Sequence, residues 1–132
     1  MPAKTQGKID LHHHIYPAAL TAAIERNGGD PSGWFVPLWI IEADHDICKA
    51  VGVASAVLSC TAPGLDIEPD PQKAQELTWA CNEFNAKIRD DEPRKYGFFA
   101  SVPSIFDTEA AIEEMTDALD TLKADGVVLM FR

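Results

Sequence analysis

The sequence has few cysteines, and they do not form a recognisable pattern. Three occur in 132 residues, at Cys48, Cys60 and Cys81, and none belongs to a C-x-x-C pair. An odd and widely spaced set of thiols argues against a disulfide framework, which secreted proteins of this size often use. We therefore expect reduced thiols and a cytoplasmic location.

Basic residues are also scarce. Eleven Lys and Arg stand against 21 Asp and Glu, which gives a formal net charge of −10. Nucleic acids and anionic membranes are bound through clustered Lys and Arg, so neither is an expected partner. No apolar run approaches the roughly 20 residues of a membrane span. The first seven residues also lack the apolar segment of a secretory signal.

What the sequence does contain is an alternation of apolar strand-like segments and helix-like segments. Gly52 is typical of a residue just past a helix end, whereas Asp70-Pro71 and Asp107 are typical of helix starts. Residues 29–38 are rich in Gly, Pro and aromatic residues and are expected to form a loop. The pattern predicts strands at 9–12, 53–59, 96–102 and 126–131, and helices at 17–27, at 40–51, from 71 and from 108.

This order predicts an α/β fold with a parallel sheet. Two architectures fit it, an open doubly wound sheet and the first half, about four strands, of a (β/α)8 TIM-type barrel. The apolar segment at 127–131 is an unusual end for a complete domain, which favours a truncated barrel. We expect residues 1–7 to form an N-terminal arm and residues 8–132 to form a partial barrel domain.

Three of the four histidines lie together in K-I-D-L-H-H-H-I-Y-P, residues 8–17. Alternate side chains of a strand share a face. The alternation therefore predicts one face with Asp10, His12 and His14 and the opposite face with Ile9, Leu11 and His13. Two imidazoles two residues apart can bind one divalent ion, with Asp10 as a weak ligand or as a partner that orients His12. The alternative interpretations are solvated histidines and a tag remnant, and His45 is expected to be a solvated helix residue.

Asp10 to Pro17 resembles the first-strand D-x-H-x-H signature of the amidohydrolase superfamily. Further segments resemble its amidohydrolase-2 branch, which includes aminocarboxymuconate-semialdehyde decarboxylase-like and 6-methylsalicylate or resorcylate decarboxylase-like enzymes. These segments are G-G-D-P-S-G-W at 28–34, L-S-C-T-A-P-G at 58–64, C-N-E-F-N-A at 81–86, P-R-K-Y-G-F-F-A-S-V-P at 93–103 and L-K-A-D-G-V-V-L at 122–129. The resemblance covers the N-terminal part of the family's length.

The resemblance implies that His12 and His14 are ligands of a divalent metal, zinc or manganese. It also implies a site at the carboxyl ends of the barrel strands. The family's remaining metal ligands and its catalytic groups are expected beyond Arg132, so the catalytic residues of this chain are unknown. Trp34 and Trp39, in W-F-V-P-L-W at 34–39, are candidate substrate contacts or simple cover for the barrel rim.

We consider three functions for this chain. The first is a metal-dependent, non-oxidative decarboxylase of a small aromatic or unsaturated carboxylic acid, with little activity expected from this chain alone. The second is a hydrolase of the same superfamily that acts on a lactone, amide or ester. The third is a non-enzymatic half-barrel that associates with itself as a homo-oligomer.

Overall fold

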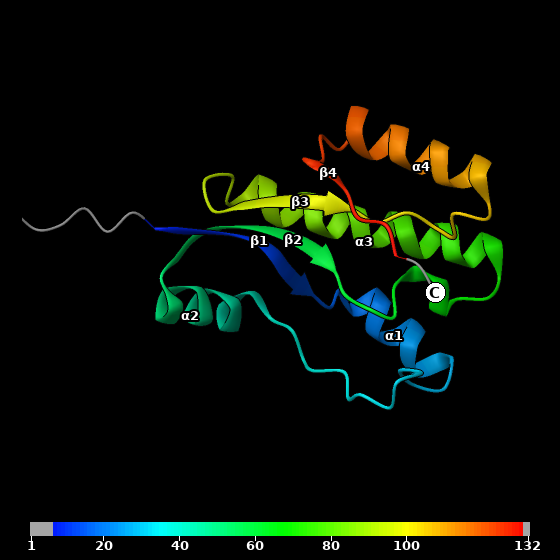
Figure 1. The fold of residues 1–132 in the computed structure, drawn as a ribbon, viewed down its shortest axis with the longest axis horizontal. Coiled ribbons are helices and arrows are strands. Elements are labelled where there is room, and N and C mark those ends of the chain that lie inside the picture. The colour runs from blue at the N-terminus through cyan, green and yellow to red at the C-terminus, as the bar shows by residue number, and fades with distance from the viewer. Residues whose placement is uncertain (1–6, 131–132) are drawn as a thin grey trace, which may run out of the picture.

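The computed structural model describes residues 7–130, in which strands alternate with helices (Figure 1). Within these residues no helix is long and apolar enough to cross a membrane. The predicted alternation is confirmed, with one additional short 3-10 helix, η1. The elements are β1 (Lys8–Ile15), α1 (Ala18–Arg26), α2 (Ile41–Val51), β2 (Val53–Cys60), η1 (Leu65–Ile67), α3 (Pro71–Asp91), β3 (Tyr96–Ala100), α4 (Thr108–Asp120) and β4 (Gly126–Val127).

The helix boundaries follow from local chemistry. Gly52 ends α2 with a left-handed φ of 75°, a conformation that costs glycine little because it has no Cβ. The Asp70 side chain accepts a hydrogen bond from the Lys73 backbone N–H at 2.9 Å at the start of α3. Asp107 does the same for Ala110 at the start of α4, at 3.3 Å. These contacts pair backbone donors that the first helical turn leaves free.

The second and third strands end within two residues of their predictions, and the other two differ more. The first runs to Ile15 because it pairs with β2 as far as Cys60, beyond the apolar residues used to predict it. The fourth contains only Gly126 and Val127, which pair with Phe99 and Ala100 of β3. The predicted end of that strand, at residue 131, lies outside the described residues.

The strands are parallel and lie in the order β1-β2-β3-β4. A strand order that follows the chain order distinguishes the two predicted architectures, because a doubly wound sheet reverses direction at a switch point. Right-handed crossovers that always advance in one direction place their helices on one face of the sheet. The fold is therefore a set of consecutive βα units of the TIM-barrel type, as predicted.

The core lies between the sheet and the helices that cover it. One cluster of buried side chains joins the strands to α3 and α4, and a second joins α1 and η1 to α3. The first contains Ile15, Ala56, Leu58, Ala86, Tyr96, Phe98, Ala100 and Ala118, and the second contains Leu20, Ala23, Ile24, Cys60, Leu65, Ile67, Leu77 and Cys81. We call the side of the sheet that faces this core the covered face, and the opposite side the open face.

The register of β1 shifts between Asp10 and His13, where three residue steps on β1 face two on β2, from Ala56 to Leu58. Such a bulge reverses the faces of the residues before it, because the side-chain period of a strand is two. The prediction that Asp10 shares a face with His12 and His14 is therefore wrong.

The bulge also changes the surroundings of two apolar residues. The alternation predicts Ile9 and Leu11 on the face of His13, but they are 69% and 62% exposed whereas His13 is half-buried. Only the part of the strand that follows the bulge keeps the predicted alternation, with Ile15 fully buried in the core.

Candidate metal centre

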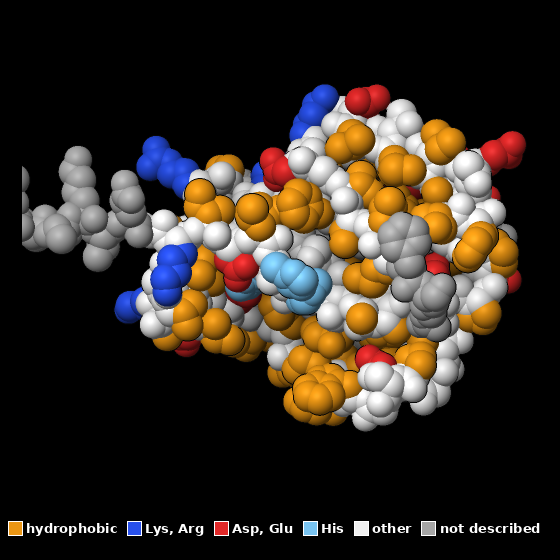
Figure 2. All heavy atoms as spheres, in the orientation of Figure 1, with side chains coloured by type: hydrophobic (Ala, Val, Ile, Leu, Met, Phe, Trp, Pro, Cys, Tyr) orange, Lys and Arg blue, Asp and Glu red, His pale blue; other side chains and the backbone are white. Residues whose placement is uncertain are grey.

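His12 and His14 lie side by side on the open face of the sheet. Their Nε2 atoms are 2.7 Å apart, and their ring centroids are 4.5 Å apart with the planes nearly perpendicular. Both residues are exposed. Figure 2 shows histidine side chains gathered at one place on the surface, with acidic side chains close by. The structure thus brings the two predicted ligands together, with both Nε2 atoms at the surface.

Ser59 on β2 fixes the orientation of the His14 ring. It is the parallel-sheet partner of His14, and its buried hydroxyl lies 3.2 Å from His14 Nδ1. Burial lowers the pKa of His14, and the neighbouring His12 ring lowers it further. A neutral imidazole whose Nδ1 is held by a neighbouring group is the form that binds metals, and the Nε2 of His14 then faces that of His12.

His13 points to the covered face, away from His12 and His14. Its Nδ1 lies 3.0 Å from Asp10 Oδ2, and its Nε2 lies 2.6 Å from Asp44 Oδ1 on α2. Burial disfavours a charged ring, but the carboxylates of Asp44 and Asp10 outweigh burial and raise the pKa of His13. The same contact with His13 lowers the pKa of Asp10.

Asp10 therefore contacts the ring of His13 rather than that of His12. Its other oxygen, Oδ1, accepts a hydrogen bond from the His12 backbone N–H at 3.0 Å. This backbone contact and the ring contact hold the bulge in a defined shape. Its predicted role as a weak metal ligand stays a prediction.

Asp44 is a further functional candidate, which the sequence pattern does not indicate. Its Oδ2 accepts a hydrogen bond from the Tyr96 hydroxyl at 2.5 Å and is 3.6 Å from the Cys48 thiol. Burial opposes its charge, but the His13 and Tyr96 contacts together lower the pKa of Asp44. Burial and this carboxylate raise the pKa values of the Cys48 thiol and the Tyr96 hydroxyl.

The apolar residues Ile47 and Val51 do not mark the buried face of α2, and for this reason Asp44 is not evident from the sequence. Ile47 and Val51 are 60% and 50% exposed, whereas Asp44 and Cys48 are the buried residues of α2. The available signal was the four-residue spacing of Asp44 and Cys48, which places them on one helical face. The polarity of Asp44 concealed it.

The fourth histidine is not simply solvated, as expected, but half-buried. His45 Nε2 lies 2.7 Å from Glu92 Oε1, and its ring stacks on Tyr96 with centroids 6.1 Å apart. It therefore joins α2 to the segment before β3. The three thiols are free and buried.

The two tryptophans lie in different environments. Trp34 is 65% exposed and stacks on Phe35, with ring centroids 5.7 Å apart. Trp39 is half-buried and contacts the edge of Phe84 on α3, with centroids 6.0 Å apart. Their predicted contact with substrate stays a prediction, and Trp39 has a packing role in addition.

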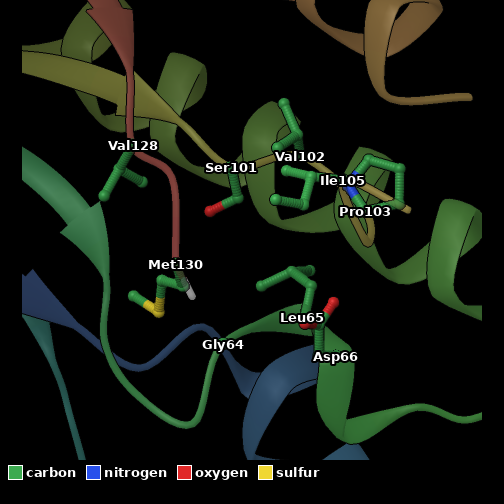
Figure 3. Close-up of a pocket in the computed structure, with 9 residues that line it drawn as sticks. All are labelled: Gly64, Leu65, Asp66, Ser101, Val102, Pro103, Ile105, Val128 and Met130. Atoms are coloured by element: carbon green, nitrogen blue, oxygen red, sulfur yellow. The ribbon is translucent and has the colours of Figure 1, made fainter. Parts of the chain in front are cut away.

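The carboxyl ends of β2, β3 and β4 meet around a small cavity (Figure 3). Its volume is about 20 Å³, enough for roughly one water molecule. Figure 3 shows the Ser101 hydroxyl directed between Val128 and Met130. The lining residues are Gly64, Leu65, Asp66, Ser101, Val102, Pro103, Ile105, Val128 and Met130. The segments predicted at the strand ends thus lie together at this edge of the sheet. The cavity between them is too small for an aromatic acid.

Comparison with known proteins identifies relatives over nearly the whole chain. The chain is 55% identical over 125 residues to the 6-methylsalicylic acid decarboxylase of Penicillium expansum, which covers 95% of this chain and 39% of that protein. No family model matches. The chain therefore spans about two fifths of the length of this relative.

Solved structures agree with this result. An amidohydrolase II structure superposes with a TM-score of 0.84 and 28% identity, over 91% of this chain and 39% of that one. A second structure is a dihydroxybenzoic acid decarboxylase from Polaromonas sp. JS666 with bound manganese and the inhibitor 2-nitroresorcinol. It superposes with a TM-score of 0.72 and 25% identity, over 92% of this chain and 37% of that one. The resemblance to the amidohydrolase-2 branch is confirmed, and it covers nearly all of this chain and part of the relatives' length.

Proposed function

We propose that this chain contributes the first-strand metal ligands to a metal-dependent, non-oxidative decarboxylase of an aromatic carboxylic acid. The observation that carries the proposal is the pair of exposed Nε2 atoms of His12 and His14, 2.7 Å apart. The names of the relatives support the reaction type, because they include a 6-methylsalicylic acid and a dihydroxybenzoic acid decarboxylase.

The donor set suits a divalent metal. Imidazole nitrogen binds zinc and other first-row divalent ions. Ser59 holds the His14 ring at Nδ1, so that an ion would replace the contact between the two Nε2 atoms. A bound ion would supply a Lewis acid for the substrate carboxylate or a neighbouring hydroxyl. Two protein donors are fewer than the three usual for catalytic zinc, so we expect weak retention by this chain alone.

We assign to the residues of this chain the positioning of metal ligands, and not the transfer of protons. The pairing of His14 with Ser59 and the hydrogen bond from the His12 backbone N–H to Asp10 position the two residues, and Ser59 fixes one ring. The open face leaves both rings accessible to a ligand. None of the described residues is assigned as the acid that protonates the substrate carbon, so we expect the isolated chain to release little CO2.

A chimaera tests the proposal directly. The matching segment of the Penicillium expansum decarboxylase is replaced by this chain, and CO2 release from 6-methylsalicylate is measured with added zinc or manganese. We expect activity in the chimaera and its loss, by at least about 100-fold, on His12→Ala or His14→Ala. A ligand change removes the metal, and with it a large part of the rate enhancement.

His45→Ala in the same chimaera is the matched control, since it removes an imidazole from α2 that lies away from the open face. It should leave turnover within a few-fold of the unmodified chimaera. A folded chimaera that leaves aromatic acids unchanged but cleaves a lactone, amide or ester would favour the hydrolase alternative.

Self-association stays the non-enzymatic alternative. Ile9 and Leu11 expose apolar side chains on β1, at the edge of the sheet in the described residues. Equilibrium sedimentation of the purified chain checks it, and a monomer that binds metal would contradict it.

A further inference from the structure

We propose a second cation site on the covered face, in which His13 Nε2, an Asp44 carboxylate oxygen and Cys48 Sγ bind a zinc ion. It is separate from the His12 and His14 pair, because His13 points to the opposite side of β1. It is also independent of the proposed decarboxylase function.

The three donors are already gathered. One ligand atom from each residue lies within 4.8 Å of the other two. His13 Nε2 is 2.6 Å from Asp44 Oδ1, and Cys48 Sγ is 3.6 Å from Asp44 Oδ2. Asp44 and Cys48 are 5% and 1% exposed. Since the donors come from a paired strand and adjacent turns of one helix, little ordering is needed on binding.

The groups behind the donors are arranged as in known metal sites. A histidine ligand usually donates its other ring N–H to a carboxylate, which fixes the ring and leaves one nitrogen for the metal. Asp10 Oδ2 occupies that position, 3.0 Å from His13 Nδ1. The Tyr96 hydroxyl holds Asp44 by a hydrogen bond of 2.5 Å. His13 therefore presents Nε2, and only Nε2, to the cluster.

The donor types favour zinc. Thiolate and imidazole are ligands that zinc shares with soft metals, whereas manganese and magnesium prefer oxygen. One carboxylate and one thiolate balance the two positive charges of the ion, which reduces the cost of burying it. On binding, the ion takes the place of the Cys48 thiol proton and of the proton between His13 and Asp44, and both protons leave to solvent.

Cobalt binding tests the proposal, because thiolate-to-cobalt charge transfer gives an absorption band that imidazole and carboxylate ligands do not. The experiment uses the His12→Ala/His14→Ala chain, in which the open-face pair is absent, and Co²⁺ followed by Zn²⁺ as probes. We expect one equivalent of metal and a near-ultraviolet thiolate band. Cys48→Ala should abolish the band and weaken zinc binding more than about 100-fold, beyond the 10- to 100-fold typical of outer-partner changes.

Cys81→Ala is the matched control, since Cys81 is another buried helical cysteine, on α3. It should keep the band. Tyr96→Phe, which loosens Asp44 without removing a ligand, should weaken zinc binding about tenfold. Circular dichroism verifies that each variant is folded.

Two results would overturn the proposal. One is no bound metal and no thiolate band in the folded double variant, which would mean that the cluster is a hydrogen-bond network only. The other is a band that survives Cys48→Ala. If the double variant does not fold, the band in the unmodified chain and its response to Cys48→Ser give the same decision.

Discussion

The two faces of β1 carry the same side chain in opposite settings. His12 and His14 lie on the open face with both Nε2 atoms exposed. His13, between them in sequence, lies on the covered face with each ring nitrogen against a carboxylate. Burial and a neighbouring ring lower the pKa of His14, whereas Asp44 and Asp10 raise that of His13 against the effect of burial.

The contrast shows that position on the strand, not residue type, determines what each imidazole does. On the covered face, a polar group must find partners because water is excluded, and Asp44 supplies them. On the open face, the Nε2 atoms contact only each other at an exposed position, so a ligand can reach both of them. The covered-face histidine should therefore contribute to stability, and the open-face pair should contribute to binding.

The largest expected effect is that of Asp44→Ala. It removes the partner of His13 and of Tyr96 in a buried site, so it should lower the free energy of unfolding by about 3 kcal/mol. Urea unfolding in the presence of a chelator measures it. Asp46→Ala, two residues along α2 and exposed, is the control and should stay within about 0.5 kcal/mol. Equal effects of the two substitutions would contradict the assigned role of Asp44.

Tyr96→Phe should have the next largest effect. The ring keeps its place in the core, but the charged Asp44 loses a hydrogen-bond donor. Hydrogen bonds to charged groups contribute about 1.5–3 kcal/mol, so a loss of about 2 kcal/mol is expected. Unfolding of Tyr96→Phe, Asp44→Ala and the double variant forms a mutant cycle. A cycle with no coupling energy would show that the two side chains act independently.

The fold was predictable because it depends on many local signals that agree. Gly52, Asp70 and Asp107 each set a helix boundary where the structure has one. The alternation alone did not determine the strand order, because an open sheet and a barrel share it, and the choice of the barrel rested on the apolar segment at 127–131 and on the family resemblance. The strand order depends on pairing between segments far apart in the chain.

The site was predictable only in part. The i, i+2 spacing of His12 and His14 was enough to bring their rings together, although His12 lies within the bulged segment. The bulge itself changed the face of Asp10, and nothing in the alternation indicates an extra residue. Asp44 was missed because a buried charge is recognised only from partners on other elements, here His13 and Tyr96.

A smaller effect is expected for a second buried acidic residue, which lies between two helices. Glu114 on α4 is buried and accepts a hydrogen bond from Asn82 Nδ2 at 2.7 Å. Burial raises its pKa, with nearby Asp117 and Glu113 adding to the shift and Asn82 opposing it. A raised pKa means that the folded chain keeps a proton that the unfolded chain loses. Stability should therefore fall as the pH rises from about 4.5 through the folded-state pKa.

Glu114→Gln removes this titration and should flatten that part of the stability profile, with a small gain at neutral pH. Unfolding by urea at a series of pH values measures it. Glu109→Gln is the matched control, since Glu109 is exposed on the same helix, and it should keep the slope. An unchanged slope in Glu114→Gln would assign the pH dependence to another group.

The smallest expected effect completes the comparison of the two faces. His12→Ala/His14→Ala removes both open-face rings, yet the free energy of unfolding in a chelator should change by less than about 0.5 kcal/mol, as for other exposed positions. Backbone pairing of β1 with β2 holds this part of the strand, and it does not need these rings. A loss of 2 kcal/mol or more would mean that the pair stabilises the fold. Unchanged stability together with lost metal binding would instead leave ligand binding as the role of the open-face histidines.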